Sequence, residues 1–503
     1  MDTPLLLNMA ADAAPDRLAL GRLAEGLTFS LLQERARNGA AWLLTHAPDA
    51  QTVVFLGLNG PALPIAMFAS GLLGKPFAPI NYRLKDEDLA KLLQRTVPSV
   101  AIVDDDMVMR LRPVEGVTVV PRSLFEEETR DSAHGRVELP EVDRDIGVLL
   151  FTSGTTGEPK AAILRHRNLT SYVISTVEFL GSDERECALV SVPPYHIAGI
   201  SAILTGVYGG RRTVHLPAFT PEIWVNEAAT EKVTHAMVVP TMLGRILDVL
   251  EQRGEKLPSL KALSYGGGRM PLITIERALK LLPHVDFVNA YGLTETSSTI
   301  AVLGPDDHRE ALNTDQEQVK RRLGSVGRPL PSVEVEIRGP NGEVLSPGQQ
   351  GEIYVRGEQV SGEYAHKKVV QDDGWFPTND GGWMDEDGYL FIEGRLDDVI
   401  VRGGENLSPG EIEEVLREHP NVGDVAVLGV PDNEWGEKVA AVIVPKGDAP
   451  STSDLANLVK SKLRSTKTPE VWEFRDALPY NDTGKLLRRQ LKAELSAKPS
   501  GTH

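Results

Sequence analysis

The stretch LLFTSGTTGEPKAAI, residues 149–163, connects two apolar segments through a loop of hydroxyl residues, glycines and a lysine. Such a loop offers backbone N–H groups, hydroxyl groups and an ammonium group as hydrogen-bond donors, which together suit phosphate oxygens. The residues concerned are Thr152, Ser153, Gly154, Thr155, Thr156, Gly157 and Lys160. Taken alone, the stretch is equally well explained by a plain surface turn.

The spacing of this loop differs from that of the phosphate loop of nucleotide kinases and GTPases. That loop has four residues between its glycines and ends in Gly-Lys-Ser or Gly-Lys-Thr. Here two residues separate Gly154 from Gly157, and Pro159 precedes Lys160. The loop is therefore not a Walker A motif.

The composition indicates an ordinary soluble protein of more than one domain. The 503 residues are 41% hydrophobic and 25% charged, so they can bury large cores and should form at least two domains. The net charge of -18 repels nucleic acid and anionic membranes, so neither is an expected partner. Cys187 is the only cysteine, which excludes an intramolecular disulfide and a cysteine-based zinc site and fits a reducing, cytoplasmic compartment.

No segment is predicted to be a secretory signal or an integral membrane span. The start, MDTPLLLNMAADAAPDR, has neither a basic n-region nor a long apolar core. The most apolar region, residues 52–80, is interrupted by prolines, by Asn59 and by Lys75. Because a spanning helix needs about 20 consecutive apolar residues, this region is predicted to be a buried strand followed by a helix.

The fold class is predicted to be α/β, because short apolar runs alternate with longer helical patterns, as in parallel sheets flanked by helices. The predicted strands are 53–58, 100–103, 148–151, 188–192 and 236–239, and the predicted helices include 66–73 and 242–252. From about residue 324 the pattern changes. In VEVEIRGPNGEVLSPGQQGEIYVRG, residues 333–357, alternation around Asn341-Gly342 predicts an antiparallel hairpin.

The last hundred residues read as a compact α+β domain. A helix is expected from Pro409, followed by strands at 425–430 and 438–444 and a helix at 452–463. We therefore predict an N-terminal domain at 1–396, which includes a small β-rich subdomain at about 324–396, and a small mobile C-terminal domain at 397–503.

The opening loop resembles the phosphate loop of the adenylate-forming superfamily, which comprises acyl- and aryl-CoA synthetases, peptide-synthetase adenylation domains and luciferases. Further blocks of that superfamily follow in order, so chance agreement is negligible and the resemblance covers nearly the whole chain. The blocks are PPYHIAG (193–199), YGGG (265–268), NAYGLTETSST (289–299), GEIYVRG (351–357), GWFPTNDGGWMDEDGYL (374–390), GRLDDVIVRGGENLSPGEIE (394–413) and LPYNDTGKLLRR (478–489).

The resemblance implies an ATP-dependent acyl-CoA synthetase, an AMP-forming acid–thiol ligase closest to the fatty-acid type. A carboxylate resists nucleophiles because its leaving group would be oxide, whereas AMP is a good leaving group. The implied reaction therefore forms an acyl-adenylate and pyrophosphate, and then a thioester with coenzyme A. The implied partners are a small carboxylic acid, ATP and coenzyme A, and the implied cofactor is Mg²⁺.

The family match also assigns the phosphate and metal contacts. The loop 152–160 suits the β- and γ-phosphates, and positive groups must neutralise charge where two anions meet. Glu295 matches the family's magnesium ligand, with Thr155 as a second ligand. Thr294 lies close enough in sequence to contact the α-phosphate.

The adenosine contacts follow from the same blocks. Tyr291 offers a ring face to adenine, and the Asn289 amide suits its exocyclic amine. The Asp380 carboxylate can accept from both ribose hydroxyls, and Arg395 can donate to the same ribose. The backbone is expected to approach the nucleotide at Gly266, Gly267, Gly268, Ala290 and Gly292. The family usually has glycine at position 379, but Asn379 tolerates left-handed backbone angles, so the turn should survive.

Lys485 matches the catalytic lysine, a point charge that bridges the carboxylate oxygen and the α-phosphate. It lies in the C-terminal domain, whereas the ATP motifs lie in the N-terminal domain. The resemblance therefore implies that the small domain rotates between the two steps, with Asp397 at the hinge. Rotation would bring Gly403, Gly404 and Glu405 to the site, where they leave room for the pantetheine arm of coenzyme A.

The acyl pocket is expected near His196 to Ile200, Thr241, Met242, Tyr265 and Ser297 to Thr299. These side chains are mainly apolar or neutral, which favours a monocarboxylate, although Arg269 is a nearby cation. His196 is interpreted as a packing residue without a proton-transfer role. Two alternatives stay open: an enzyme that loads a carrier protein's phosphopantetheine, and a catalytically silent nucleotide-binding regulator. The oligomeric state stays open too, with a homodimer as one option.

Overall fold

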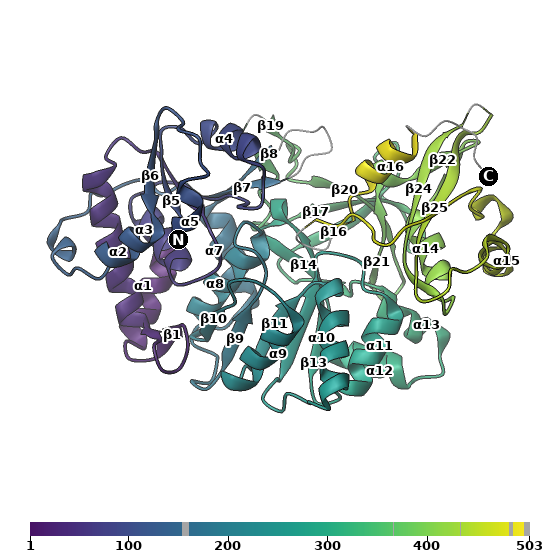
Figure 1. Ribbon diagram of the computed structural model, residues 1–503, viewed down its shortest axis with the longest axis horizontal. Coiled ribbons are helices and arrows are strands. Elements are labelled where there is room, and N and C mark those ends of the chain that lie inside the picture. The colour runs from purple at the N-terminus through teal and green to yellow at the C-terminus, as the bar shows by residue number, and fades with distance from the viewer. Residues whose placement is uncertain (153–159, 366, 433, 482–485, 497–503) are drawn as a thin grey trace.

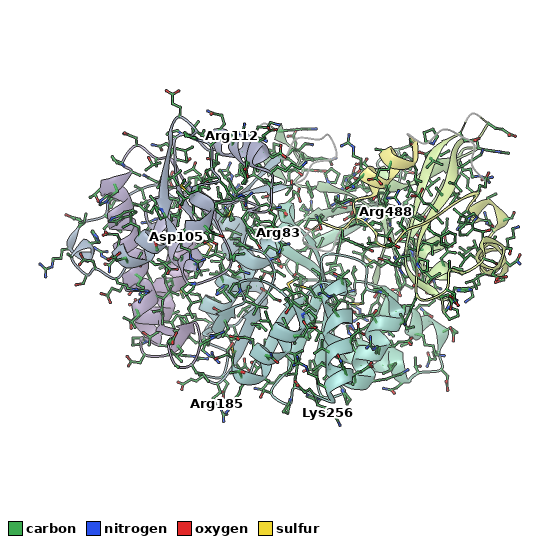
Figure 2. The ribbon with its side chains drawn as sticks, in the orientation of Figure 1. Arg83, Asp105, Arg112, Arg185, Lys256 and Arg488 are labelled. Atoms are coloured by element: carbon green, nitrogen blue, oxygen red, sulfur yellow. The ribbon has the colours of Figure 1, made fainter. Side chains whose placement is uncertain are left out.

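The computed structural model describes residues 1–152, 160–365, 367–432, 434–481 and 486–496. Figure 1 shows a large N-terminal part, coloured purple to green, and a smaller yellow-green C-terminal part at one end of the long axis. Figure 2 shows Arg185 and Lys256 at the outer edge of the large part and Arg488 among the elements of the small part.

The first sheet is parallel at its centre and antiparallel at one edge. In spatial order its strands are β19 (Lys367–Lys368), β18 (Glu363–Tyr364), β8 (Lys160–Arg165), β7 (Ile146–Thr152), β4 (Phe77–Pro79), β3 (Thr52–Leu56), β5 (Ser99–Val103) and β6 (Val117–Pro121). The pair β7 and β8 is antiparallel, with Thr152 opposite Lys160. The two described ends of the predicted phosphate loop are therefore held side by side, and the loop residues 153–159 lie outside the described residues.

The second sheet has the same plan. In spatial order its strands are β15 (Arg328–Pro329), β14 (Ser298–Leu303), β13 (Asp286–Leu293), β12 (Ala262–Gly266), β11 (His235–Val238), β9 (Cys187–Val190), β10 (Arg212–His215), β1 (Leu18–Leu20) and β2 (Leu27–Thr28). The strands from β13 to β1 are parallel, and the flanking strands are antiparallel.

Helices separate and cover the two sheets. The helices are α1 (Thr3–Ala13), α2 (Phe29–His46), α3 (Ala62–Leu72), α4 (Asp86–Gln94), α5 (Asp105–Val108), α6 (Arg122–Glu128), α7 (His166–Thr176), α8 (Ile197–Gly209), α9 (Pro221–Thr230), α10 (Pro240–Arg253), α11 (Leu272–Leu281), α12 (Pro305–Asn313), α13 (Glu317–Lys320), α14 (Pro409–Arg417), α15 (Thr452–Lys462) and α16 (Arg488–Ser496). One core joins α1, α2, α3, α7 and α8 to the first sheet. A second core joins α9, α10 and α11 to the second sheet.

Two smaller sheets complete the molecule. The β-rich subdomain contains β16 (Glu334–Arg338), β17 (Gly351–Arg356), β20 (Phe376–Met384) and β21 (Leu390–Arg395). The C-terminal part contains β23 (Glu405–Leu407), β22 (Ile400–Arg402), β25 (Gly436–Pro445), β24 (Val422–Asp432) and β26 (Val471–Phe474). A short turn, Leu396–Asp398, joins the two sheets.

The α/β prediction is confirmed, with one refinement: both large sheets carry antiparallel strands at their edges. The predicted antiparallel pairing around residues 333–357 is also confirmed, because β16 pairs with β17. The Asn341-Gly342 turn closes only an isolated bridge between Arg338 and Val344, and β17 begins later, at Gly351. None of the described helices is long and apolar enough to cross a membrane.

Candidate active site

Tyr291, Asp380 and Arg395 meet in one corner of the site, although they are far apart in sequence. The Tyr291 hydroxyl donates to Asp380 Oδ2 at 2.6 Å, and Arg395 Nε lies 2.9 Å from Asp380 Oδ1. Strand pairing brings them together, because Asp380 of β20 lies opposite Arg395 of β21. The Asp380 side chain is 8% exposed, so a neighbouring cation is needed to stabilise its charge.

The charges of this corner are fixed by their surroundings. Loss of solvent around its hydroxyl, followed by the Asp380 charge, raises the pKa of Tyr291 well above the ordinary value, so the phenol remains a donor. Loss of solvation lowers the pKa of Arg395, but the Asp380 carboxylate together with Tyr291, Glu295 and Tyr364 more than offsets this, and the net shift is upward. The corner therefore presents an ionised carboxylate held by two donors, an arrangement suited to a sugar diol.

The turn before Asp380 adopts the backbone that the sequence suggested. Asn379 has φ of 60°, in the left-handed region that asparagine tolerates better than most residues. Its Nδ2 donates to Asp397 Oδ2 at 2.9 Å. The predicted hinge residue is thus bonded to the residue beside Asp380.

Close backbone packing explains two of the predicted glycines. A Cβ at Gly266 would lie 2.3 Å from the Ala290 carbonyl oxygen, and a Cβ at Gly292 would lie 1.8 Å from that of Ser298. Gly267 has φ of 77°. Asn289 Nδ2 donates to the Ser325 carbonyl at 2.9 Å, which leaves the amide oxygen of Asn289 as the acceptor for an exocyclic amine.

Tyr364, which the sequence reasoning did not find, lies at the end of the site where the phosphates are predicted to bind. The Tyr364 hydroxyl donates to Glu295 Oε1, and the Lys160 ammonium lies 5.9 Å from the centre of the Tyr364 ring. Burial, followed by the Glu295 charge, raises the pKa of Tyr364, so its hydroxyl stays protonated. Strand β18 places this side chain, because Tyr364 pairs with Ala162 of β8.

Glu295 is positioned by its backbone as well. Its carbonyl oxygen accepts from the N–H groups of Ser361 and Gly362, at 2.8 and 3.1 Å. It lies in a short turn, Thr294–Thr296, directly after β13. A single oriented carboxylate fits Mg²⁺, which keeps several waters and takes few protein ligands beside phosphate. The second predicted ligand, Thr155, lies outside the described residues.

A cavity of about 570 Å³ lies between the second sheet and helices α7 and α8. Its lining includes Ser264, in the middle of β12, and Ala290 of β13. Ala290 directly precedes Tyr291, which with Asp380 and Arg395 forms the predicted nucleotide corner. The lining also includes Ala198, Ser298 and Thr299, which fall in the ranges predicted for the acyl pocket.

The side chains named individually for the acyl pocket are not among the residues that line this cavity. Tyr265 follows Ser264 on β12 and faces the opposite side of the sheet, where its hydroxyl contacts His308 Nε2 at 2.8 Å. Ile200 and Met242 are buried in the two large cores. The remaining three are His196, whose ring packs on Tyr195 at 4.7 Å, the exposed Thr241, and Ser297, which is fully buried. Strand alternation would have favoured Ser264 over Tyr265.

The predicted coenzyme A residues form an exposed turn of the C-terminal sheet. Gly403 and Gly404 have φ of 57° and 83°, and Glu405 begins β23. Lys485 lies outside the described residues. Arg488, at the start of the helix that follows it, donates to Glu413 Oε1 and to the Val427 carbonyl at 2.5 and 2.6 Å.

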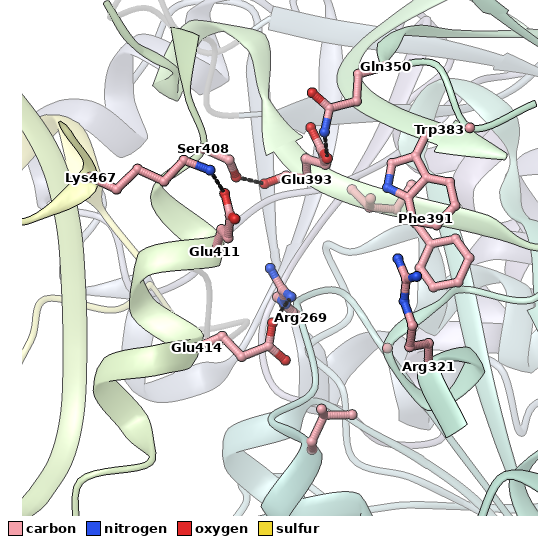
Figure 3. A pocket seen from close by; sticks show the side chains of 14 residues that line it. Arg269, Arg321, Gln350, Trp383, Phe391, Glu393, Ser408, Glu411, Glu414 and Lys467 are labelled. Atoms are coloured by element: carbon pink, nitrogen blue, oxygen red, sulfur yellow. Dashed lines mark hydrogen bonds and ion pairs between the residues drawn. The ribbon is translucent and has the colours of Figure 1, made fainter. Parts of the chain in front are cut away.

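A cleft of about 750 Å³ separates the β-rich subdomain from helix α14. Figure 3 shows Glu411 and Glu414 of α14 on one side and the stacked rings of Trp383 and Phe391 on the other. Arg269 forms an ion pair with Glu414 in this cleft. Arg269, the cation that the sequence analysis placed near the acyl pocket, thus forms an ion pair that links the two parts of the molecule.

The fold and the site define a two-domain enzyme that binds a nucleotide next to a second small molecule. The chain belongs to the AMP-binding enzyme family: the model of that family matches residues 7–365. The model of the AMP-binding enzyme C-terminal domain matches residues 411–485.

Known proteins of similar sequence and structure agree with this assignment. A 2-succinylbenzoate–CoA ligase of Bacillus licheniformis is 33% identical over 504 residues, with 98% of this chain and 100% of the relative covered. A feruloyl-CoA synthase of an Amycolatopsis species is 33% identical, with 96% of each covered. The structure of the o-succinylbenzoate CoA synthetase of Bacillus subtilis with its acyl-adenylate intermediate matches with a TM-score of 0.83 and 28% identity, covering 97% of each chain.

Proposed function

We propose that the protein is an ATP-dependent acyl-CoA synthetase. A carboxylate oxygen of the acid attacks the α-phosphorus of ATP, which forms the acyl-adenylate and releases pyrophosphate. The thiol of coenzyme A then attacks the acyl carbon and releases AMP. The named relatives, which are CoA ligases of 2-succinylbenzoate and of a feruloyl group, support this reaction class.

One observation carries the proposal: a residue that lines the cavity is directly followed in the sequence by a residue of the nucleotide corner. Ala290 lines the cavity, and the next residue, Tyr291, bonds to Asp380. An acid in the cavity and a ribose at Asp380 would therefore be neighbours. Holding two reactants in contact in this way converts a bimolecular step into an effectively unimolecular one.

The side chains take distinct roles in this scheme. Asp380, Arg395 and Tyr291 hold the ribose. Glu295, with Thr155, would hold Mg²⁺, which neutralises phosphate charge when bound. Lys485 supplies the positive charge between the carboxylate and the α-phosphate. Rotation of the C-terminal domain about Asp397 then moves Lys485 away and brings the turn of residues 403–405 to the active site. The carrier-protein alternative is less favoured because GGENLSPGEIE resembles acyl-CoA synthetases. A fatty acid as substrate, a cytoplasmic location and a homodimer remain predictions from the sequence.

Carboxylate-dependent exchange of labelled pyrophosphate into ATP tests the proposal. We expect exchange with at least one acid of a broad panel and thioester formation once coenzyme A is added. Nucleotide binding without exchange for any acid would support the silent regulator instead. Asp380→Asn should weaken ATP binding roughly tenfold, because charge-assisted hydrogen bonds are about twice as strong as neutral ones.

A further inference from the structure

The cavity beside the nucleotide corner has a polar far end. The parallel strands run from Ala262, His235 and Ala188 at the amino edge of the sheet to the nucleotide corner at the carboxyl edge. Arg211 directly precedes β10 at the same amino edge. Both Arg211 and His235 belong to the cavity lining. Ala262 is separated from Gly266 by four strand steps, which corresponds to about 13 Å along the sheet.

The walls between these ends carry small side chains on the helix and a mixture of small and larger apolar side chains on the sheet. The lining contributed by α8 is Ala198, Ser201, Ala202, Thr205 and Gly206, which lie on one face of the helix. The strands contribute Ala188, Ala262, Ser264 and Ala290 together with the larger Leu189, Val190, Met237, Val288 and Val302. Protein interiors are normally packed with few voids larger than a water. Small side chains on both the sheet and the facing helix therefore leave a slot suited to a flat group such as an aromatic ring.

Three hydroxyl groups of the helical walls already donate to backbone carbonyls. Ser201 donates to Ile197 and Thr205 to Ser201, both at 2.8 Å. Thr176 donates to Tyr172 at 2.7 Å. These side chains therefore behave as nearly apolar surface, and a polar group of the ligand finds few partners along the walls.

The far end differs because Arg211 and His235 retain hydrogen-bonding capacity. Arg211 uses Nε and Nη2 on Glu186, at 3.2 and 3.0 Å, and among the described residues Nη1 is the guanidinium nitrogen outside that pair. Lys261 also contacts Glu186, at 3.3 Å. Arg211 and Lys261 thus share the single Glu186 carboxylate, and the choice between a hydroxyl and a second carboxylate depends on His235, the other polar residue of this end.

His235 offers an acceptor. Its Nδ1 lies 2.8 Å from Thr234 Oγ1, and that hydroxyl donates its hydrogen to the Cys187 carbonyl. Nδ1 therefore carries the hydrogen of the pair, and Nε2 is left as an acceptor. Burial, followed by the Arg211 charge, lowers the pKa of His235 to about 4, so the ring is neutral at pH 7.

We propose that the acid is an aromatic monocarboxylate whose ring, held in this slot, carries a hydroxyl group at the end away from the carboxylate. The hydroxyl donates to His235 Nε2 and accepts from Arg211 Nη1. The distance along the sheet favours a short spacer between ring and carboxylate, as in a hydroxyphenylpropenoate, over a simple benzoate. This assignment rests on the proposed acyl-CoA synthetase function and specifies its substrate class.

Matched acids test the assignment with the full-length protein. The panel contains 4-hydroxycinnamate, cinnamate, 4-carboxycinnamate, and fatty acids of eight to sixteen carbons, and kcat/KM is measured by thioester formation. We expect the hydroxyl to raise kcat/KM about tenfold or more over cinnamate, because a site built for a hydroxyl rejects the analogue that lacks it. A higher value for 4-carboxycinnamate or for any fatty acid, or equal values for the first two acids, would overturn the assignment.

Two variants localise the effect. His235→Leu should reduce the ratio of the hydroxylated to the unsubstituted acid to about one. Lys261→Met, which alters the same Glu186 cluster from outside the cavity, should leave the ratio unchanged. A ratio that survives in His235→Leu contradicts the proposal, as does a ratio lost equally in both variants.

A binding measurement separates this inference from the proposed function. Line broadening of 4-hydroxycinnamate and cinnamate in NMR spectra reports binding without turnover. Selective binding of the hydroxylated acid without adenylation would support the slot assignment and contradict the synthetase reaction. Turnover of acids without selectivity for the hydroxyl group would support the synthetase reaction and contradict the slot assignment.

Discussion

Tyr364 links two charged groups of the nucleotide site, the Glu295 carboxylate through its hydroxyl and the Lys160 ammonium through its ring. A carboxylate that is oriented before Mg²⁺ arrives loses less freedom on binding than one that is not. The residue follows the GEIYVRG block by seven positions, but no local pattern marks it. Its role follows only from the pairing of β18 with β8.

Replacing Tyr364 by Phe should lower carboxylate-dependent pyrophosphate exchange roughly tenfold, because hydrogen bonds to charged groups contribute about 1.5–3 kcal/mol. The loss should be partly recovered at high Mg²⁺ concentration. Tyr389→Phe is the matched control, since the Tyr389 hydroxyl donates to the Asp307 carboxylate at 2.6 Å. Exchange in Tyr364→Phe equal to that of the control would refute the role.

At the level of helices and strands, the sequence predicts the elements well because they depend on local periodicity. The predicted strand 100–103 corresponds to Ser99–Val103, and the predicted helix 452–463 to Thr452–Lys462. The residues of the nucleotide corner could be predicted because they lie in sequence motifs of the family. The cavity lining was harder to predict, because it depends on which face of β12 and α8 each side chain occupies and on which helices cover the sheet.

Substitution of two glycines by alanine should have opposite effects on the stability of the protein. Gly292→Ala should destabilise the fold by several kcal/mol and impair nucleotide binding, because its Cβ would collide with the Ser298 carbonyl. Gly244→Ala, in the middle of α10 and with open space around the position, should stabilise the protein by about 0.5–1 kcal/mol. Chemical denaturation of both variants measures these changes. Similar effects of the two substitutions would contradict the packing described for β13.

The docking of α1 on α7 should depend on pH. His166 Nδ1 accepts from the Thr3 N–H at 3.2 Å, and burial lowers the pKa of His166 to about 4, from 6.5. The unfolded chain therefore binds more protons than the folded one between these values. The contribution of neutral His166 to the free energy of unfolding is fully present above about pH 6.5 and is lost as the pH falls toward 4.

Denaturation curves between pH 7 and 4 check this dependence. One such histidine contributes a slope of up to about 1.4 kcal/mol per pH unit, and His215 and His235 act in the same direction. His166→Asn should reduce the slope by this amount at most. A slope identical to that of the parent protein would show that His166 is already protonated in the folded state.

On the scale of the whole molecule, the reaction couples the large N-terminal part to the small C-terminal part. Among the residues that the structure describes, the bonds between them include polar ones such as the Arg269–Glu414 ion pair and the Ser408 hydroxyl on the Glu393 carbonyl at 3.0 Å. Polar contacts of this kind exchange readily with water, which would suit the proposed rotation of the small domain between the two half-reactions.

Lys485→Ala should separate the half-reactions. We expect adenylation to fall by two orders of magnitude or more, because a positioned charge at the attacking group is lost. Thioester formation from supplied acyl-adenylate should stay within about threefold of the parent. Lys492→Ala, which removes a lysine paired with Glu437 in α16, serves as the control. Equal loss of both steps in Lys485→Ala would contradict domain alternation.

The most direct test of the central claim follows the oxygen atoms of the acid. In the proposed reaction a carboxylate oxygen becomes bonded to the α-phosphorus and leaves with AMP when the thiol attacks the acyl carbon. With an acid labelled by ¹⁸O in both carboxylate oxygens, mass spectrometry should find one labelled oxygen in AMP and one in the thioester. Unlabelled AMP, or label in inorganic phosphate, would show that the acid is not activated as an adenylate.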